Sequence, residues 1–293
     1  MKTERKTRDT NSPIRIQISE VCIYCGACSE VCPMGVLRVE KETPSPKAPV
    51  ITDSSACILC GQCISVCPKD AIANSHLALD DFPIIEAAPN IEWNQFVALT
   101  RQRRSTRSFT DNHVPREIIE KILDESTRYA PTGHNRQATE IRIIQGEDLE
   151  KLRDGMNAVI LRLERVLRYL HWVSAYLDSQ WQMLRPFAHM IESGLDPSTR
   201  GAPLLLLFFA DDRIKESEID AAIWSYQTLL SAEVLGIGSC YLGALVNALP
   251  YSRFLRSLIS TSVHRRLVCG LLLGYSKAKY KRLVPRAPIG ILS

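Results

Sequence analysis

Eight of the ten cysteines in this chain stand in two short runs with the same spacing. The first run, CIYCGACSEVCP, places Cys22, Cys25, Cys28 and Cys32 at offsets of three, three and four residues and ends in proline. The second run, CILCGQCISVCP, repeats that spacing at 57–68. Three thiols on one tight loop can bind three corners of an iron–sulfur cubane. In this spacing the fourth cysteine binds the other cluster.

The repeat therefore predicts two [4Fe-4S] clusters with crossed ligation. We expect one cluster on Cys22, Cys25, Cys28 and Cys67, and the second on Cys57, Cys60, Cys63 and Cys32. Structural zinc sites use two separated C-x2-C pairs rather than three cysteines in one run. Disulfides are typical of secreted chains, whereas MKTERKTRDTNSPIR is basic and polar and has no apolar signal segment. The cysteines thus favour iron–sulfur clusters and a cytoplasmic location.

Length and composition suggest more than one domain. With 293 residues, 45% of them hydrophobic, the chain can fold a small cluster domain and one ordinary domain of about 200 residues. Residues 14–76 resemble the two-cluster bacterial ferredoxins. We therefore expect a disordered tail at 1–13, a ferredoxin domain at 14–76, a linker at 77–94 and a second domain at 95–293.

Charge and apolar patterning exclude some partners. The net charge of +4 is mild and does not by itself indicate nucleic acid or a membrane surface. The longest strongly apolar run, APLLLLFFA at 202–210, is far shorter than the about 20 residues that span a bilayer. We expect neither nucleic acid nor a membrane as a partner.

The second domain mixes helical and strand patterns, which predicts an α+β fold with a central sheet flanked by helices. Buried or alternating strands are expected at 140–145, 203–211 and 268–276. Helices are expected at 115–130, at 149–191 as two pieces, and at 218–236, where Gly236 fits a C-cap.

Three short stretches of this domain carry chemistry. RQRRSTRSF at 101–109 mixes arginines with hydroxyls, the combination that binds a phosphate monoester, although most charge runs are solvated faces. APTGHNRQ at 130–137 offers Thr132, Asn135 and Gln137 to the edge of a planar heterocycle. LGIGSCYLG at 235–243 lacks the G-x-G-x-x-G spacing and follows a helix, so a Rossmann site is disfavoured.

Together with GAP at 201–203 and GYSKAKYKRLVPRAP at 274–288, these stretches resemble the nitroreductase family across 95–291. The whole chain resembles the ferredoxin–nitroreductase fusions of anaerobic bacteria and archaea. The resemblance implies an α+β flavoprotein that dimerises through long helices and holds FMN at the subunit interface. It also implies that 173–195 either covers the substrate as a lid or belongs to the interface.

The resemblance further assigns roles residue by residue. Arginines and a serine would bind the ribityl and phosphate groups, two amides would lie near the isoalloxazine, and a turn would offer backbone groups to the ring. These are Arg103, Arg104, Ser105, Arg107 and Arg286 for the first role, Asn135 and Gln137 for the second, and Tyr241, Leu242 and Gly243 for the third. Many relatives have proline and a large aromatic residue where Ala138 and Thr139 stand, so the pocket floor is expected to differ.

The pairing of cofactors predicts the reaction class. Iron–sulfur clusters pass single electrons, and FMN exchanges one or two. We expect a flavin-dependent oxidoreductase that takes electrons from an external ferredoxin-type or other low-potential donor through the clusters to FMN. A nitro compound, quinone or activated alkene would be the acceptor, and no acid–base residue stands out. Two alternatives stay open, an electron-transfer adaptor without a dedicated substrate and an iron–sulfur sensor.

Overall fold

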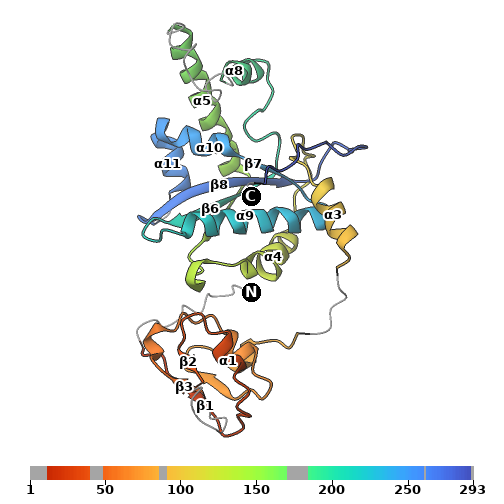
Figure 1. The fold of residues 1–293 in the computed structure, drawn as a ribbon. Helices are drawn as coiled ribbons and strands as arrows, with labels where there is room; N and C mark the ends of the chain where they lie inside the picture. Colours follow the sequence, from red (N-terminus) through yellow and green to blue (C-terminus); the bar gives the residue numbers. More distant parts are fainter. Residues whose placement is uncertain (1–11, 40–48, 86–90, 170–183, 261, 292–293) are drawn as a thin grey trace. The chain divides into compact units, whose positions relative to one another are not determined.

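The computed structural model describes residues 12–39, 49–85, 91–169, 184–260 and 262–291. The chain forms two compact units, Met1–Asn90 with His134–Arg136, and Ile91–Gly133 with Gln137–Ser293 (Figure 1). Each unit is described by itself. None of the described helices is long and apolar enough to cross a membrane. The domain limits expected from the sequence remain predictions.

The first unit is a repeat of two similar halves. Each half has a short helix directly after the first cysteines of its run, and two antiparallel strand pairs close the unit. The helices are α1 (Ala27–Glu30), α2 (Gln62–Ser65), η1 (Ser54–Ala56) and η2 (Leu79–Asp81), and the strands are β1 (Ile16–Ile18), β2 (Leu37–Arg38), β3 (Val50–Ile51) and β4 (Ile72–Asn74). Strand β1 pairs with β4, and β2 pairs with β3.

A left-handed glycine opens α1 and α2. Gly26 has φ 79° and Gly61 has φ 73°, conformations that L side chains rarely adopt. A Cβ on Gly61 would also lie 2.8 Å from the ring of Phe82. The glycine inside each cysteine run is therefore what lets the loop turn tightly between the second and third thiols.

The second unit is built on an antiparallel sheet in the order β5-β6-β8-β7. Its strands are β5 (Glu140–Gln145), β6 (Leu204–Asp211), β7 (Gly238–Tyr241) and β8 (Arg265–Gly274). Every residue of β6 is buried, because helices cover both faces of the sheet. This arrangement confirms the predicted α+β class and three of the strands, whereas β7 was not expected.

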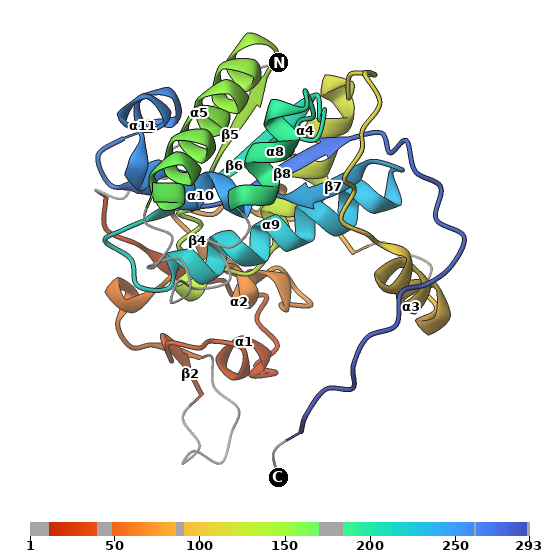
Figure 2. The same ribbon diagram turned by 90° about the horizontal axis from the view of Figure 1, so that it is seen from above.

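Helices lie on both faces of that sheet (Figures 1 and 2). The helices of this unit are α3 (Trp93–Gln102), α4 (Arg116–Glu125), α5 (Glu147–Tyr169), α8 (Leu184–Glu192), α9 (Ser217–Val234), α10 (Gly243–Ala248), α11 (Arg253–Ile259), η3 (Thr127–Tyr129) and η5 (Leu249–Tyr251). The short helix η4 (Gly133–Asn135) begins in this unit and ends in His134–Arg136, which belong to the first unit. The long helical pattern expected at 149–191 includes α5 and α8. Residues 170–183 between them, including 173–183 of the possible lid at 173–195, lie outside the described residues.

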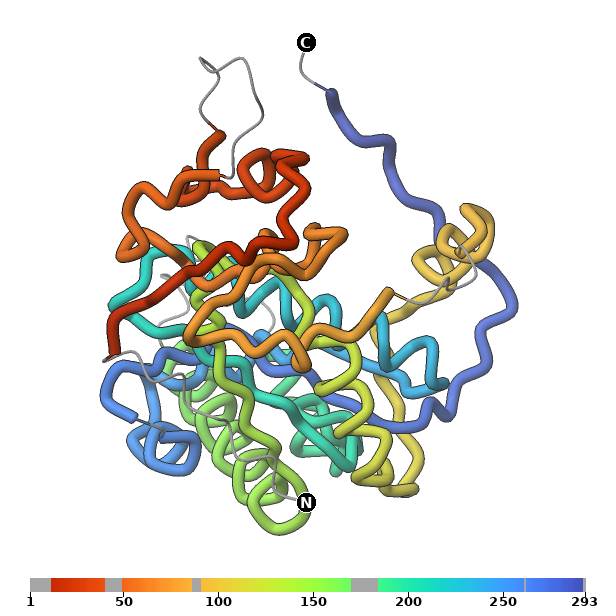
Figure 3. The backbone as a smooth tube through the Cα atoms, turned by 90° about the horizontal axis from the view of Figure 1, so that it is seen from below, coloured from red at the N-terminus to blue at the C-terminus, as the bar shows by residue number. Residues whose placement is uncertain are grey.

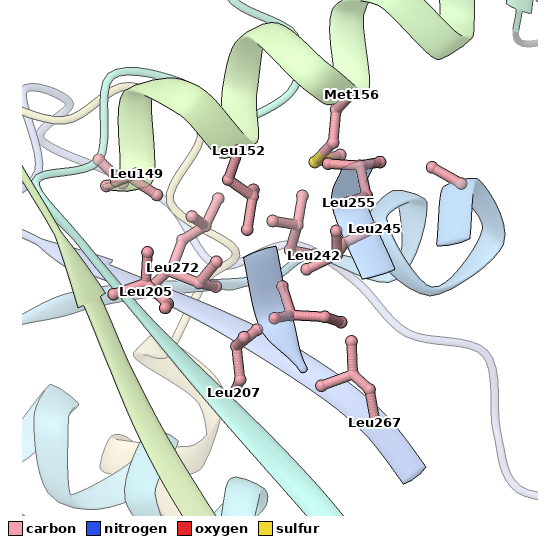
Figure 4. Close-up of a cluster of buried hydrophobic side chains, with 14 of the residues drawn as sticks. Leu149, Leu152, Met156, Leu205, Leu207, Leu242, Leu245, Leu255, Leu267 and Leu272 are labelled. Atoms are coloured by element: carbon pink, nitrogen blue, oxygen red, sulfur yellow. The ribbon is translucent and has the colours of Figure 1, made fainter. Parts of the chain in front are cut away.

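Alternate residues of β6 separate two hydrophobic cores. Leu205 and Leu207 pack with Leu152 and Met156 of α5 and with helices α10 and α11 (Figure 4). Leu204, Leu206 and Phe208 face the other way and pack against α4 and α9. Successive residues of β6 point to opposite faces of the sheet, and both faces are buried. Every position of the strand is therefore apolar or buried, which explains the continuous apolar run in the sequence.

The arginine-rich segment extends the sheet beyond β7. Ser105 forms a parallel bridge with Ser239, and Phe109 forms an antiparallel bridge with Ser276. The Thr106 N–H donates to the Ser239 carbonyl at 2.8 Å. After β8, the chain from 275 to 291 has no helix and runs as an extended segment (Figure 3). The fold thus brings 101–109, 235–243 and the start of the closing segment together.

Candidate functional site

Two small cavities in the first unit are each lined by four cysteines. Cys67 joins the three leading cysteines of the first run at one cavity. Cys32 joins the three leading cysteines of the second run at the other. Each cavity therefore takes its fourth thiol from the opposite run, which is the grouping that crossed ligation requires.

Each group of four cysteines lines a cavity. Among the described residues, no three His, Cys, Asp or Glu side chains converge on a position for a single metal ion. Four thiols around a cavity suit a four-iron cubane better than one tetrahedral zinc ion. The donor set therefore fits the predicted clusters.

Backbone amides already point at the sulfurs. The Val36 N–H donates to the sulfur of Cys32, and the Ala71 N–H donates to the sulfur of Cys67, both at 3.2 Å. The Tyr24 N–H donates to the sulfur of Cys22 at 3.4 Å. Amide donors stabilise thiolate ligands and tune the reduction potential of a cluster.

Burial raises the pKa of three of these thiols, those of Cys28, Cys57 and Cys63. The pKa of Cys63 is raised to about 11, mainly by burial and in addition by the neighbouring Cys57, Cys60 and Cys32. Burial is also the main reason that the pKa of Cys28 is raised, with contributions from Cys22 and Cys67. Metal ligation must release these protons, so cluster binding and folding of this unit are coupled.

In the second unit, the arginine segment begins at the end of α3. Arg103 is the C-cap of that helix. The Nη1 of Arg104 donates to the carbonyls of Arg101 at 2.5 Å and Arg103 at 2.8 Å. Glu233 lies near the end of α9. Burial raises the pKa of its carboxyl, and the nearby guanidinium groups of Arg103 and Arg104 offset part of that rise. Arg107 is exposed.

Two buried polar atoms beside this segment lack partners among the described residues. They are the Oγ of Ser239, which forms the bridge with Ser105, and the Nε of Arg104, the residue before Ser105. A buried donor without a partner is costly, and a phosphate or ribityl oxygen would satisfy both atoms. These residues therefore fit the phosphate end of FMN.

The turn after β7 carries Tyr241, Leu242 and Gly243, the residues that the sequence predicts beside the flavin ring. Tyr241 shares a 2.9 Å hydrogen bond between its hydroxyl and the hydroxyl of Ser225, and burial raises the pKa of the phenol. The Leu242 N–H donates to the Gly270 carbonyl at 2.8 Å, and Gly243 begins α10. The turn is thus held by helix α9 and by strand β8.

The loop at 130–137 is fixed at the opposite end of α9. The Gln137 N–H donates to Oγ1 of Thr132 at 3.1 Å, and the Gly133 N–H donates to Oδ1 of Asp220 at 2.9 Å. Asn135 has φ 54° and Gln137 has φ 49°, left-handed values that are uncommon outside glycine. The loop is therefore held in a strained shape by the first turn of α9.

One chain does not assemble all the predicted flavin residues. Asp220 and Glu233 are 13 positions apart on α9, so they are separated by about 20 Å along the helix. The arginine segment lies near Glu233, whereas the loop that carries Thr132 and Gln137 is bonded to Asp220 through Gly133. The hydroxyl of Tyr241 bonds Ser225, which lies between these two ends of α9. Arg286 is exposed in the extended closing segment, and no hydrogen bond or ion pair joins it to these groups in the described structure.

A larger cavity of about 630 Å³ opens beside the same turn. Tyr241, Leu242 and Gly243 form one wall, and α5, α8 and α10 form the others. Arg200 also lines it. Sequence reasoning did not single out Arg200, Asp220 or Glu233, because none of them belongs to a pattern that spacing alone could show.

Comparisons with known proteins agree with this layout. The model described as "Nitroreductase family" matches residues 100–275, and the model described as "4Fe-4S dicluster domain" matches residues 21–71. A "4-nitrobenzoate reductase" from Nocardioides sp. (strain LMS-CY) is 27% identical over 219 residues, which cover 66% of this chain and 85% of that protein. A second protein of that name from Pseudomonas putida is 27% identical over 208 residues, covering 62% of this chain and 86% of that one.

Solved structures share the fold of the second unit. A nitroreductase with bound FMN from Bacteroides fragilis NCTC 9343 is 21% identical with a TM-score of 0.53, covering 68% of this chain and 100% of that one. A nitroreductase with bound FMN from Desulfitobacterium hafniense DCB-2 is 21% identical with a TM-score of 0.51, covering 67% of this chain and 97% of that one. At this level of identity, the likeness concerns the fold.

Proposed function

This chain belongs to the nitroreductase family, and on that premise we propose that it is an FMN-dependent oxidoreductase supplied with electrons by its own two-cluster ferredoxin domain. Electrons would enter from an external low-potential donor and leave to a small organic acceptor. When bound, the [4Fe-4S] clusters supply single-electron transfer and FMN supplies the exchange between one-electron and two-electron steps.

The observation that carries this proposal is the presence of two kinds of site on one chain. Two cavities each gather four thiols in the crossed pattern. In the same chain, an arginine–serine segment is bridged to β7 beside unpartnered buried donors. Because both domains belong to one chain, the cluster domain can supply electrons to the flavin domain within the same protein.

The residues of the chain hold and orient the cofactors. Backbone N–H groups donate to the cluster thiolates. Arg103, Arg104 and Arg107 supply charge-assisted hydrogen bonds for a phosphate, and Ser105 adds a hydroxyl. The 241–243 turn, held by Ser225 and Gly270, presents backbone groups to the ring. These roles remain proposals for each residue.

A nitroaromatic compound is the acceptor class that we propose first, because the two related proteins are named 4-nitrobenzoate reductases. The first two-electron step would be Ar–NO₂ + 2 e⁻ + 2 H⁺ → Ar–NO + H₂O, with the electrons coming from the donor and the protons from solvent. Quinones and activated alkenes accept the same number of electrons and are the next classes to assay.

A homodimer would complete the flavin site. Helix α9 carries an exposed apolar stripe in which Ile219 is 63%, Ile223 36% and Tyr226 49% exposed. Two copies of α9 packed antiparallel about a two-fold axis would bury this stripe. The same packing would bring the 132–137 loop and the arginine segment of both chains to one interface, whereas a single chain holds them at opposite ends of α9.

Cofactor analysis tests the proposal. Anaerobically purified protein should contain about eight iron atoms, with acid-labile sulfide, and about one FMN per chain. Protein reduced through a ferredoxin-type donor should be reoxidised by 4-nitrobenzoate. Zinc without acid-labile sulfide would contradict the clusters. Reoxidation by artificial dyes alone would instead favour an electron-transfer adaptor.

A further inference from the structure

The 630 Å³ cavity beside the 241–243 turn has the properties of a ligand site. Its volume is within the range of about 300–1,000 Å³ that small-molecule sites occupy. Its walls are mostly apolar, with Ile160 and Leu163 from α5, Phe187 from α8 and Val246 from α10. Such a space accepts an aromatic ring next to the proposed flavin contacts.

Arg200 is the charged residue among the described residues that line this cavity. Its side chain is half-buried, and its backbone is in the left-handed region with φ 59°. A guanidinium group in a mostly apolar cavity favours an anionic partner, because an unpaired charge there is poorly solvated.

The loop that carries Arg200 is fixed by its own hydrogen bonds. Oδ1 of Asp196 accepts the N–H groups of Ser198 at 3.0 Å and Thr199 at 2.8 Å, and Oδ2 accepts the Gly201 N–H at 2.9 Å. The Ser198 hydroxyl donates to Oδ1 of Asn157 on α5 at 2.7 Å. Both carboxylate oxygens of Asp196 therefore hold the loop backbone, and Arg200 is presented in a set position.

Other arginines of this unit are already engaged. Arg162 donates to the Tyr251 carbonyl, and Arg256 donates to the carbonyls of Leu249 at 2.6 Å and Pro250 at 3.0 Å. Arg265 pairs with Asp211 at 3.0 Å. In the described part of the chain, the Arg200 guanidinium makes no hydrogen bond and no ion pair, so its donors are available to a ligand.

We propose that Arg200 binds the carboxylate of an aromatic acceptor and thereby selects aromatic acids over neutral aromatic compounds. The planar fork of a guanidinium group matches a planar carboxylate in a bidentate pair. A single cation suits one negative charge better than a phosphate dianion. The ring of the acid lies among the apolar walls. This inference rests on the proposed function and names the substrate class of that site.

A binding experiment tests this role without turnover. The full-length protein loaded with clusters and FMN is titrated anaerobically with benzoate or with neutral benzamide, and the flavin absorbance reports binding. Benzoate should bind about tenfold or more tightly than benzamide, as expected for a hydrogen-bonded charge pair. Arg200→Gln should remove this preference, and Arg200→Lys should keep part of it.

A matched variant controls for net charge. Arg185 is exposed on α8 and does not line the cavity, so Arg185→Gln should keep the full preference for benzoate. In turnover, Arg200→Gln should raise KM for 4-nitrobenzoate by about tenfold or more and leave nitrobenzene unchanged.

The outcomes separate this inference from the proposed function. Equal binding of benzoate and benzamide by the parent protein, or a benzoate preference that survives Arg200→Gln, overturns the role of Arg200. A preference for benzoate that Arg200→Gln abolishes supports it, even in a protein that reduces neither nitro compounds nor quinones. That last result would contradict only the proposed function.

Discussion

Arg104 and Arg107 stand three residues apart, yet their guanidinium groups have different surroundings. Arg104 folds back on the carbonyls of Arg101 and Arg103 at the end of α3. It therefore supports the helix terminus and also offers its buried Nε to a ligand. Arg107 is exposed, so its removal should leave the fold intact and report on phosphate binding alone.

Arg107→Ala should weaken FMN binding by about 1.5–3 kcal/mol, the value of a hydrogen bond to a charged group. Riboflavin lacks the phosphate, so its affinity should not change. Fluorescence titration of the flavin-free protein with each ligand measures the difference. Arg101→Ala is the matched control, because Arg101 is an exposed arginine in the last turn of α3. Equal losses for FMN and riboflavin would show that Arg107 supports the fold instead.

The residues that spacing alone could find are those whose partners lie nearby in the chain. The two cysteine runs have the same fixed offsets, and each run is short. Their spacing therefore predicts even that Cys67 joins the first site and Cys32 joins the second. Arg200 and Glu233 join their sites only after the sheet has folded. The separation of Gln137 from Arg103 depends on the length of α9, which no motif encodes.

At the scale of elements, the contact between the arginine segment and β7 depends on the absence of a side chain at Gly238. A Cβ on Gly238 would lie 2.5 Å from Oγ1 and 3.1 Å from the Cβ of Thr106, which is itself buried. The Thr106 N–H donates to Ser239 at 2.8 Å. Glycine at 238 therefore lets this segment pair closely with the strand.

Gly238→Ala should destabilise the protein by about 1–3 kcal/mol, the usual cost of overpacking a buried contact. Thr106→Ala removes the closest atom, so the double variant should lose less stability than the sum of the two single variants. Urea unfolding of the four proteins measures this coupling. Gly243→Ala is the stability control, since nothing lies within 4 Å of its added Cβ. Additive losses would contradict the contact.

The elements that composition predicted are those with long apolar patterns. PLLLLFFAD gives β6 because a strand buried on both faces is a continuous apolar run. The strand β7 was missed, because GSCY is four residues of mostly small side chains and becomes a strand only by pairing with β8. Helix α3 begins at Trp93, inside the linker expected at 77–94, because its apolar residues are few.

At the scale of the whole molecule, helix α9 connects folding, assembly and the flavin site. It packs one face on β6 and β8 with Leu229 and Ala232. It leaves Ile219 and Tyr226 exposed on another face. A helix that is apolar on more than one face usually has a second partner. We propose that this partner is α9 of a second copy.

Ile219→Glu should dissociate the dimer and lower FMN affinity together. A glutamate in the first turn of a helix interacts favourably with the helix dipole, so the single chain should remain folded. Sedimentation across a range of protein concentrations and FMN titration of the same samples measure both effects. Val263→Glu, at a side chain that is 91% exposed, controls for the added charge. A monomer with unchanged FMN affinity would show that each chain holds a complete site.

The proposed electron supply from the ferredoxin domain to the flavin also involves the whole molecule. Cys67 lies in the second run but lines the cavity of Cys22, Cys25 and Cys28. Cys67→Ser should therefore damage that cluster and leave the thiols at the other cavity in place. The second unit has its own two cores and uses none of these thiols, so its FMN content should not change.

Electron transfer in the Cys67→Ser protein should depend on the route. Dithionite reduces FMN directly, so flavin reduction by dithionite and reoxidation by a nitroaromatic compound should match the parent protein. Reduction by a ferredoxin-type protein donor should be severely slowed, because one of the two clusters that supply the flavin is lost. Anaerobic stopped-flow absorbance measures both rates on one sample, with the dithionite reaction as the internal control. If the donor reduces the flavin of the variant as fast as that of the parent, the cluster at Cys67 is not on the route to FMN.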